Sequence, residues 1–143
     1  MTTAAPSITY GRAVDVARPY DDTVAATRAA LMEQGFGVLT EIDVRATFKK
    51  KLDVEFRPYV ILGACNPTLA HRALSAEMAI GLLLPCNVIV YAGDNAGTSV
   101  VAVLDPEAQL GLTGRDDLKP LASEVRAKLN RVLDAVKAKE NKE

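Results

Sequence analysis

The sequence has one histidine, two cysteines and almost no net charge, and each scarcity narrows the range of functions. A formal net charge of −1 provides no overall basic field, so we expect no nucleic-acid partner. With His71 as the single histidine, no Ser–His–Asp arrangement can be argued. No GxGxxG or Walker pattern occurs, and "GDNAG" has the composition of a hairpin turn rather than a phosphate-binding loop.

Long apolar runs are also missing. The longest are well short of the roughly 20 residues that a membrane span needs, so we expect no membrane insertion. The start "MTTAAPSITY" lacks a cationic segment followed by an apolar one, which predicts a protein that is not exported. In that setting two cysteines are expected to be reduced thiols in a soluble, cytoplasmic protein.

The length and composition predict one domain. A chain of 143 residues with 49% apolar residues can bury a substantial core. We find no internal repeat and no linker, so we expect one domain over residues 8–138. Residues 1–7 would form a flexible tail, and residues 139–143 a charged one.

The first half of the chain alternates between strand and helix patterns. Strands are predicted over residues 8–16 and 36–44 and a helix between them, capped by Asp21 or Asp22 and stopped at Gly35. The predicted buried stripe of this helix is Val24, Ala25, Leu31 and Met32. In the second strand we expect Phe36, Val38, Ile42 and Val44 on one face, with Leu39, Glu41 and Asp43 on the other.

The second half begins with a short amphipathic helix carrying Val44, Phe48 and Leu52 at spacings of four. A third strand follows over residues 57–65, and then a helix over residues 67–80 with Asn66 as cap and Pro67 in its first position. Residues 87–91 and 98–104 form a predicted hairpin around "AGDNAG", and residues 116–138 a long helix.

The order β-α-β-α-β-α-β-β-α predicts an α+β fold with a mostly antiparallel sheet and helices packed on it. The strands starting at Tyr59, Asn87 and Thr98 are apolar on both faces. Because large exposed apolar patches are rare on monomers, we expect a partner subunit to cover the second face. The sequence therefore predicts a homodimer.

Several blocks, in this order, resemble the bacterial and archaeal family called domain of unknown function 302. They are "GFGVLTEIDVRATFKKKL", "ILGACNP", "IGLLLPCNVIVY" and the later "LDP". The resemblance runs from about Ile8 to Ala138. It implies a curved antiparallel sheet, an architecture similar to that of the TATA-box-binding protein, and dimeric members. It implies no reaction, because the family is defined without one.

The two cysteines are the main candidate site. Cys65 ends a strand directly before a helix cap, and the partial positive charge of a helix N-terminus lowers the pKa of a nearby thiol. A helix over residues 67–80 travels roughly 21 Å, and "GLLLPC" as an extended return brings the chain back by roughly 16 Å. Cys86 could then lie beside Cys65 as its partner. The alternative is that both are inert thiols packed in the core.

Other residue types near this locus allow further hypotheses. Cys65, Cys86 and His71, with Glu41 or Asp43, are a ligand set of the kind that holds zinc or copper, whereas His71 alone suits a helix surface. Asn66 and Asn87 are candidate ligand-binding residues, although a cap and a backbone contact also explain them. The run of Lys49, Lys50 and Lys51 suits a solvated helix face or an anion site.

Three functions follow as hypotheses, and the sequence leaves open whether the protein is an enzyme. The first is a thiol-based redox or metal-binding module centred on Cys65 and Cys86. The second is a small-ligand-binding module with no chemistry, in which the cysteines only line a pocket. The third is a dimeric interaction module with both cysteines as core packing.

Overall fold

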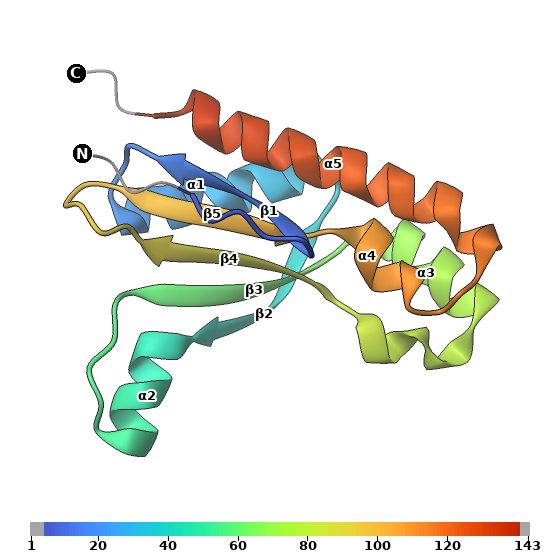
Figure 1. The fold of residues 1–143 in the computed structure, drawn as a ribbon, viewed down its shortest axis with the longest axis horizontal. Coiled ribbons are helices and arrows are strands. Elements are labelled where there is room, and N and C mark those ends of the chain that lie inside the picture. The colour runs from blue at the N-terminus through green and yellow to red at the C-terminus, as the bar shows by residue number, and fades with distance from the viewer. Residues whose placement is uncertain (1–4, 141–143) are drawn as a thin grey trace.

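The computed structural model describes residues 5–140, which form a five-stranded antiparallel sheet with helices on it (Figure 1). The strands lie in the order β1-β5-β4-β3-β2. Their bounds are β1 Gly11–Val16, β2 Gly37–Asp43, β3 Tyr59–Cys65, β4 Cys86–Ala92 and β5 Ser99–Leu104. The α-helices are α1 Tyr20–Glu33, α2 Val44–Leu52, α3 Pro67–Ala76, α4 Pro106–Gly111 and α5 Lys119–Ala138. The 3₁₀ helices are η1 Met78–Leu83 and η2 Asp116–Leu118. The predicted α+β class and antiparallel pairing are confirmed.

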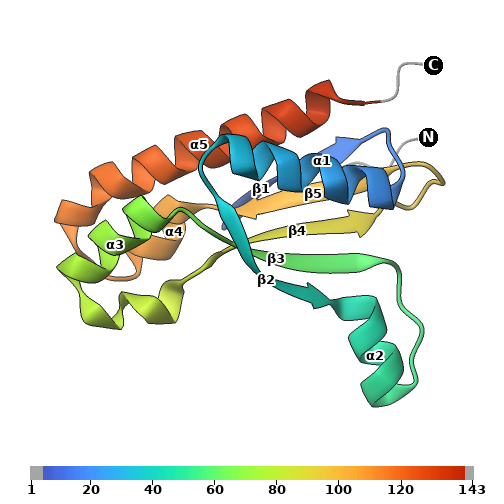
Figure 2. The same ribbon diagram turned by 180° about the vertical axis from the view of Figure 1, so that it is seen from behind.

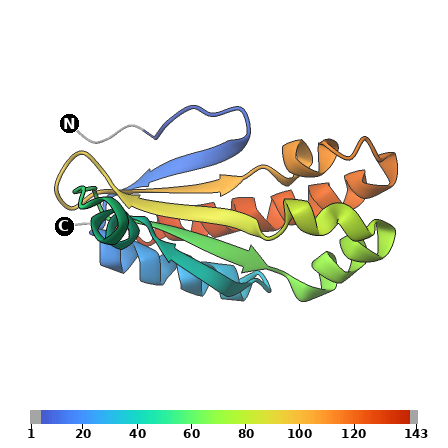
Figure 3. The same ribbon diagram turned by 90° about the horizontal axis from the view of Figure 1, so that it is seen from below.

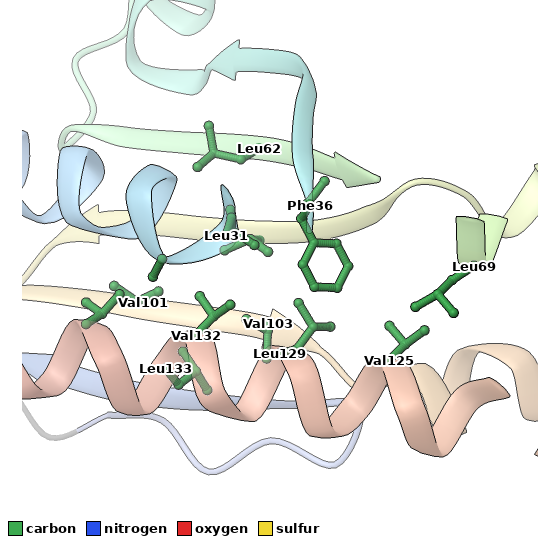
Figure 4. Close-up of a cluster of buried hydrophobic side chains, with 14 of the residues drawn as sticks. Leu31, Phe36, Leu62, Leu69, Val101, Val103, Val125, Leu129, Val132 and Leu133 are labelled. Atoms are coloured by element: carbon green, nitrogen blue, oxygen red, sulfur yellow. The ribbon is translucent and has the colours of Figure 1, made fainter. Parts of the chain in front are cut away.

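The two longest helices, α1 and α5, cover the same face of the sheet (Figures 1 and 2). The core lies between them and the strands. Leu31 of α1, Leu62 of β3, and Leu129 and Leu133 of α5 are almost completely buried there (Figure 4). The predicted stripe of α5, spaced by three and four residues, is therefore the stripe that packs on the sheet.

No helix covers the other face of the sheet (Figure 3). We call this the open face. On the open-face side of the sheet, α2 projects at one end, next to β2 and β3. The helices α3, η1 and α4 lie beyond the opposite end of the sheet (Figures 1 and 3).

The predicted face assignment of the second strand is wrong for part of β2. Val38 pairs with Ala64 and Ile42 with Ile61, and the register shifts between Val38 and Thr40. This bulge inserts one residue, so the alternation changes phase and Ile42 comes to lie on the open face, opposite to Val38. A regular two-residue alternation does not reveal such an insertion.

The helix α1 also differs from its predicted details. It begins at Tyr20 after Pro19, whose carbonyl accepts a 2.9 Å hydrogen bond from the Thr23 hydroxyl, so neither Asp21 nor Asp22 is the cap. Its buried residues are Thr23, Ala26, Thr27, Ala30 and Leu31. Met32, predicted to be buried, is 77% exposed. The buried face is rotated because small residues and threonines allow α1 to lie close to α5.

The helix predicted over residues 67–80 is shorter in the structure, and a 3₁₀ helix follows it. α3 ends at Ala76, where Arg115 donates a 2.9 Å hydrogen bond to the Ala76 carbonyl and pairs with Glu77. "GLLLPC" is not an extended return, because its first three residues belong to the 3₁₀ helix η1, which ends at Leu83. The helix α4, which was not predicted, follows Asp105 and Pro106. Asp105 accepts a 2.9 Å hydrogen bond from the Glu107 amide, so a cap and a proline start this helix as they start α3.

The predicted tails, residues 1–7 and 139–143, lie partly outside the described residues. Within the part that the structure describes, no helix is both long and apolar enough to cross a membrane.

Candidate functional site

The junction of β3 and α3 has the predicted cap. Asn66 is extended, and its Oδ1 accepts a 3.3 Å hydrogen bond from the Leu69 amide, while Pro67 takes the first helical position. Gly35 lies against this cap in a left-handed conformation (φ 83°), and a Cβ at this position would lie 3.0 Å from the side-chain nitrogen Nδ2 of Asn66. The loop before β2 is therefore fitted to the cap that follows Cys65.

The strand register does not place the two thiols directly opposite each other. Cys86 pairs with Ala64, so the chain does return to the level of Cys65. Directly opposed residues share a face, and successive residues of a strand alternate between faces. The register thus puts Cys86 opposite Ala64 on the helix-covered face, whereas Cys65, the last residue of β3, has no directly opposed residue in β4. Both cysteines are free, and a side-by-side pair is not supported.

Both cysteines nevertheless line one small cavity, of about 40 Å³, beneath α3 and α4. The Cys86 thiol donates a 3.7 Å hydrogen bond to the Oε1 atom of Gln109, and the Gln109 amide donates to the Leu83 carbonyl. The cavity has room for a few water molecules but is far below the roughly 300 Å³ of a small-molecule site. Its lining is otherwise mainly apolar: Phe36, Ala64, Leu69, Ala70, Ala73, Leu84, Pro85, Pro106, Leu110, Leu121 and Val125, with Asn66 at the cap.

Burial, with a smaller contribution from the nearby Cys65, raises the pKa of the Cys86 thiol to about 11. The low-dielectric surroundings disfavour the thiolate, so Cys86 is neutral at physiological pH. The nucleophilic and metal-binding form of cysteine is the thiolate. Cys86 is thus suited to packing and to its bond with Gln109.

We expect Cys86 to be alkylated slowly in the folded protein. A pKa raised by about two units lowers the thiolate fraction near neutral pH by about a hundredfold. In a Cys65→Ser variant, iodoacetamide should therefore react with native Cys86 about a hundred times more slowly than with the urea-unfolded chain. Equal rates in the two states would contradict the assignment of Cys86 as a buried neutral thiol.

The predicted metal ligands do not gather. Among residues 5–140 no three histidine, cysteine, aspartate or glutamate side chains form a group that could hold a metal. His71 is exposed on α3 and does not line the cavity. Glu41 pairs with Arg28, and Asp43 caps α2 by accepting a 2.9 Å hydrogen bond from Ala46. A zinc or copper site at the cysteines is therefore not supported.

Asn87 and Gln109 complete this locus. Asn87 is exposed at the start of β4, opposite Gly63. Gln109, the buried residue that binds Cys86, was not predicted as a site residue. The Asp105-Pro106 start signal could have predicted α4 and placed Gln109 on its first turns, but no sequence pattern indicates that this turn faces Cys86.

The open face is the second candidate site. One register row crosses all five strands on this face and contains only Ile42, Ile61, Ile89, Ala102 and Ala13. In the neighbouring row Tyr59 pairs with Tyr91 and Tyr91 with Val100. Val100 and Ala102 are buried, flanked by the taller Tyr91 and Ile89. The row is therefore apolar throughout, but at β5 it is already buried within the chain, and its most exposed member is Ile42, at 48%.

Aromatic residues gather on the same side. The Tyr59 and Tyr91 rings stack at 5.3 Å, Phe56 lies 6.2 Å from Tyr59, and Phe48 lies 5.1 Å from Phe56. Burial raises the pKa of the Tyr59 hydroxyl, and Tyr91 and Tyr10 raise it further. Tyr10 is therefore also a neighbour of Tyr59 on this side of the sheet. The chain has only four tyrosines and three phenylalanines. Five of these seven rings thus lie on the side without core helices.

Comparison with known proteins identifies relatives but no activity. The family described as "Domain of unknown function DUF302" matches residues 12–136. The chain is similar to an uncharacterised conserved DUF302 protein from Bacillus stearothermophilus, whose crystal structure superposes with a TM-score of 0.82. The two sequences are 30% identical, and the match covers 90% of this chain and 99% of that one. No curated protein matches.

Proposed function

We propose, from the premise that the chain belongs to the DUF302 family, that it is a homodimeric interaction module. Its contact surface is the open face, and its two cysteines serve as packing. The observation that carries the proposal is the apolar, aromatic-rich sheet face that no helix of the chain covers. Aromatic residues are enriched at protein interfaces and dominate their binding energy.

The exposed area on this side supports an interface. Tyr10, Ile42, Leu52, Val54 and Phe56 are each between 41% and 64% exposed. At about 100 Å² for each, they present roughly 500 Å² of apolar surface. That is more than half of the roughly 800 Å² that each partner contributes to a standard interface. Polar residues at the rim would supply the remainder.

The charges on this side favour a second copy of the chain as the partner. Residues 41–57 hold five cationic and four anionic side chains. A two-fold interface brings a surface against itself, and a strongly charged surface would then repel its copy. The mixed surface avoids this repulsion. It also offers no continuous basic field for nucleic acid.

We expect Ile42→Lys to weaken the dimer. Ile42 ends the apolar row of the open face, and an unpaired lysine buried in an interface costs free energy. Its dissociation constant should rise at least tenfold, measured by sedimentation equilibrium between 0.1 and 50 µM. Met32→Lys is the control, because Met32 is also an exposed apolar residue but lies on α1, across the sheet from the open face, and its change should leave the dimer intact.

The wild-type protein decides the proposal itself. If it sediments as a single chain at 50 µM, the homodimeric function is wrong. If Met32→Lys dissociates the dimer and Ile42→Lys does not, the contact surface has been assigned to the wrong side of the sheet.

The thiol-based function remains a second candidate because Cys65 is only partly buried and lies beside the capped end of α3. A thermal-shift series separates the candidates. Stabilisation by zinc or copper that is lost in Cys65→Ser favours metal binding. Stabilisation by small organic molecules that survives in a variant lacking both cysteines favours ligand binding.

The TATA-box-binding-protein-like architecture implied by the family resemblance also remains a prediction.

A further inference from the structure

We propose that the end of α5, which we define as residues 134–140, closes the free edge of β1 and keeps a second copy of the chain from extending the sheet there. The edge of a sheet presents unpaired backbone groups that pair readily with another chain. The proposal does not depend on the open-face dimer, because it concerns a different surface and applies to a single chain as well as to a dimer.

The hydrogen bonds of β1 show which of its backbone groups point away from the sheet. β1 pairs with β5 without a register shift, and the Tyr10 carbonyl continues this ladder by accepting a 2.8 Å hydrogen bond from the Asp105 amide. Because bonding alternates along an antiparallel pair, the even-numbered residues from 10 to 16 bond to β5. The residues whose amides and carbonyls point outward are therefore Gly11, Ala13, Asp15 and, just after the strand, Ala17.

Side chains from the end of α5 bind two of these outward groups. The Lys137 ammonium donates a 2.5 Å hydrogen bond to the Asp15 carbonyl, and the Ala17 amide donates a 2.8 Å hydrogen bond to the Glu140 carboxylate. Lys137 and Glu140 also pair with each other at 3.0 Å. One cation and one anion thus occupy an acceptor and a donor that a further strand would need.

The packing of α5 holds these side chains at the edge of the sheet. Leu133 and Val136 are completely buried in the core, which fixes the last turns of the helix beside β1 (Figures 1 and 2). Arg12 of β1 forms a 3.2 Å ion pair with Asp134, one helical turn before Lys137. The contact between α5 and β1 therefore extends along the strand from Arg12 to its end.

The opposite edge of the sheet is interrupted in another way. β2 carries the bulge between Val38 and Thr40, which breaks its ladder of free backbone groups. β1 has no bulge, so its outward groups would offer a regular template to another strand. Charged side chains are among the means by which natural proteins block such an edge. The end of α5 supplies this protection at β1.

A double variant tests the proposal. Lys137→Ala with Glu140→Ala removes both side chains and leaves the net charge unchanged. At 50 µM, sedimentation velocity should show assemblies of at least twice the wild-type mass, because two uncovered β1 edges can then pair. The matched control is Lys119→Ala with Asp116→Ala, which removes an ion pair of 3.0 Å at the other end of α5 and should leave the wild-type mass unchanged.

Two further measurements separate strand pairing from aggregation of unfolded chains. Adding Ala13→Pro to the double variant removes an outward amide without breaking a bond to β5, and should restore the wild-type mass. In the assembled double variant, hydrogen exchange should slow at the Ala13 amide and stay slow in β4, the central strand. If the variant with Ala13→Pro does not fold, the exchange measurement decides.

The outcomes separate this proposal from the homodimeric function. A double variant that keeps the wild-type mass, or a control that assembles equally, overturns it. Assemblies that persist in a folded variant with Ala13→Pro, or in which β4 exchanges fast, also overturn it. Assemblies that Ala13→Pro dissolves, or in which the Ala13 amide is protected and β4 stays slow, support it. A wild type that is a single chain contradicts only the homodimer, because this test compares each variant with the wild type.

Discussion

Leu129→Ala is expected to lower the free energy of unfolding by about 3–4 kcal/mol. Leu129 lies on α5 against the sheet and is 1% exposed, among Phe36, Val103 and Val132 (Figure 4). Removing three buried carbon atoms costs their transfer free energy and leaves a cavity that neighbouring elements fill only partly. The loss is a large fraction of the 5–15 kcal/mol by which native domains are stable.

The matched control is Leu112→Ala. It makes the same chemical change at a residue that is 78% exposed, and should alter stability by less than about 0.5 kcal/mol. Urea unfolding followed by circular dichroism measures both at one protein concentration, since association would shift the midpoint. Similar losses in the two variants would show that α5 does not hold the core together as described.

The parts of the fold that the sequence predicted are those governed by local patterns. The stripe of α5 repeats over five turns, and Asn66 with Pro67 marks the start of α3, so both were predicted correctly. The phase change at Leu39 could not be predicted, because a bulge depends on the neighbouring strand β3 rather than on the sequence of β2. The burial of α1 likewise depends on how closely α5 approaches it.

The same distinction applies to the candidate site. The cap beside Cys65 is local and was predicted, whereas the relation between the two thiols depends on strand register and on the end of α3. Arg115, nearly forty residues downstream, ties that end in place, and no local signal reports such a contact. The uncovered sheet face was predictable because strands that are apolar on both faces need cover on both.

The burial of the Cys86 thiol gives a second large effect, which depends on pH. Burial favours the neutral thiol in the folded state, so the pKa of Cys86 rises to about 11 on folding. A raised folded-state pKa contributes stability that is complete below the unfolded pKa, near 9, and is lost as the pH rises to about 11. At about 1.4 kcal/mol for each pKa unit, the loss approaches 2–3 kcal/mol.

Other groups titrate in this pH range, and a difference measurement removes their contribution. We expect the stability of the wild type relative to Cys86→Ala to fall by about 2–3 kcal/mol between pH 8 and pH 11, measured by urea unfolding. Cys65→Ala is the control, because it leaves the buried thiol in place and should preserve the decline. A wild-type advantage that stays constant with pH would mean that Cys86 ionises equally well in both states. Its thiol would then be accessible to water, and the packing role assigned to it would give way to the thiol-based function.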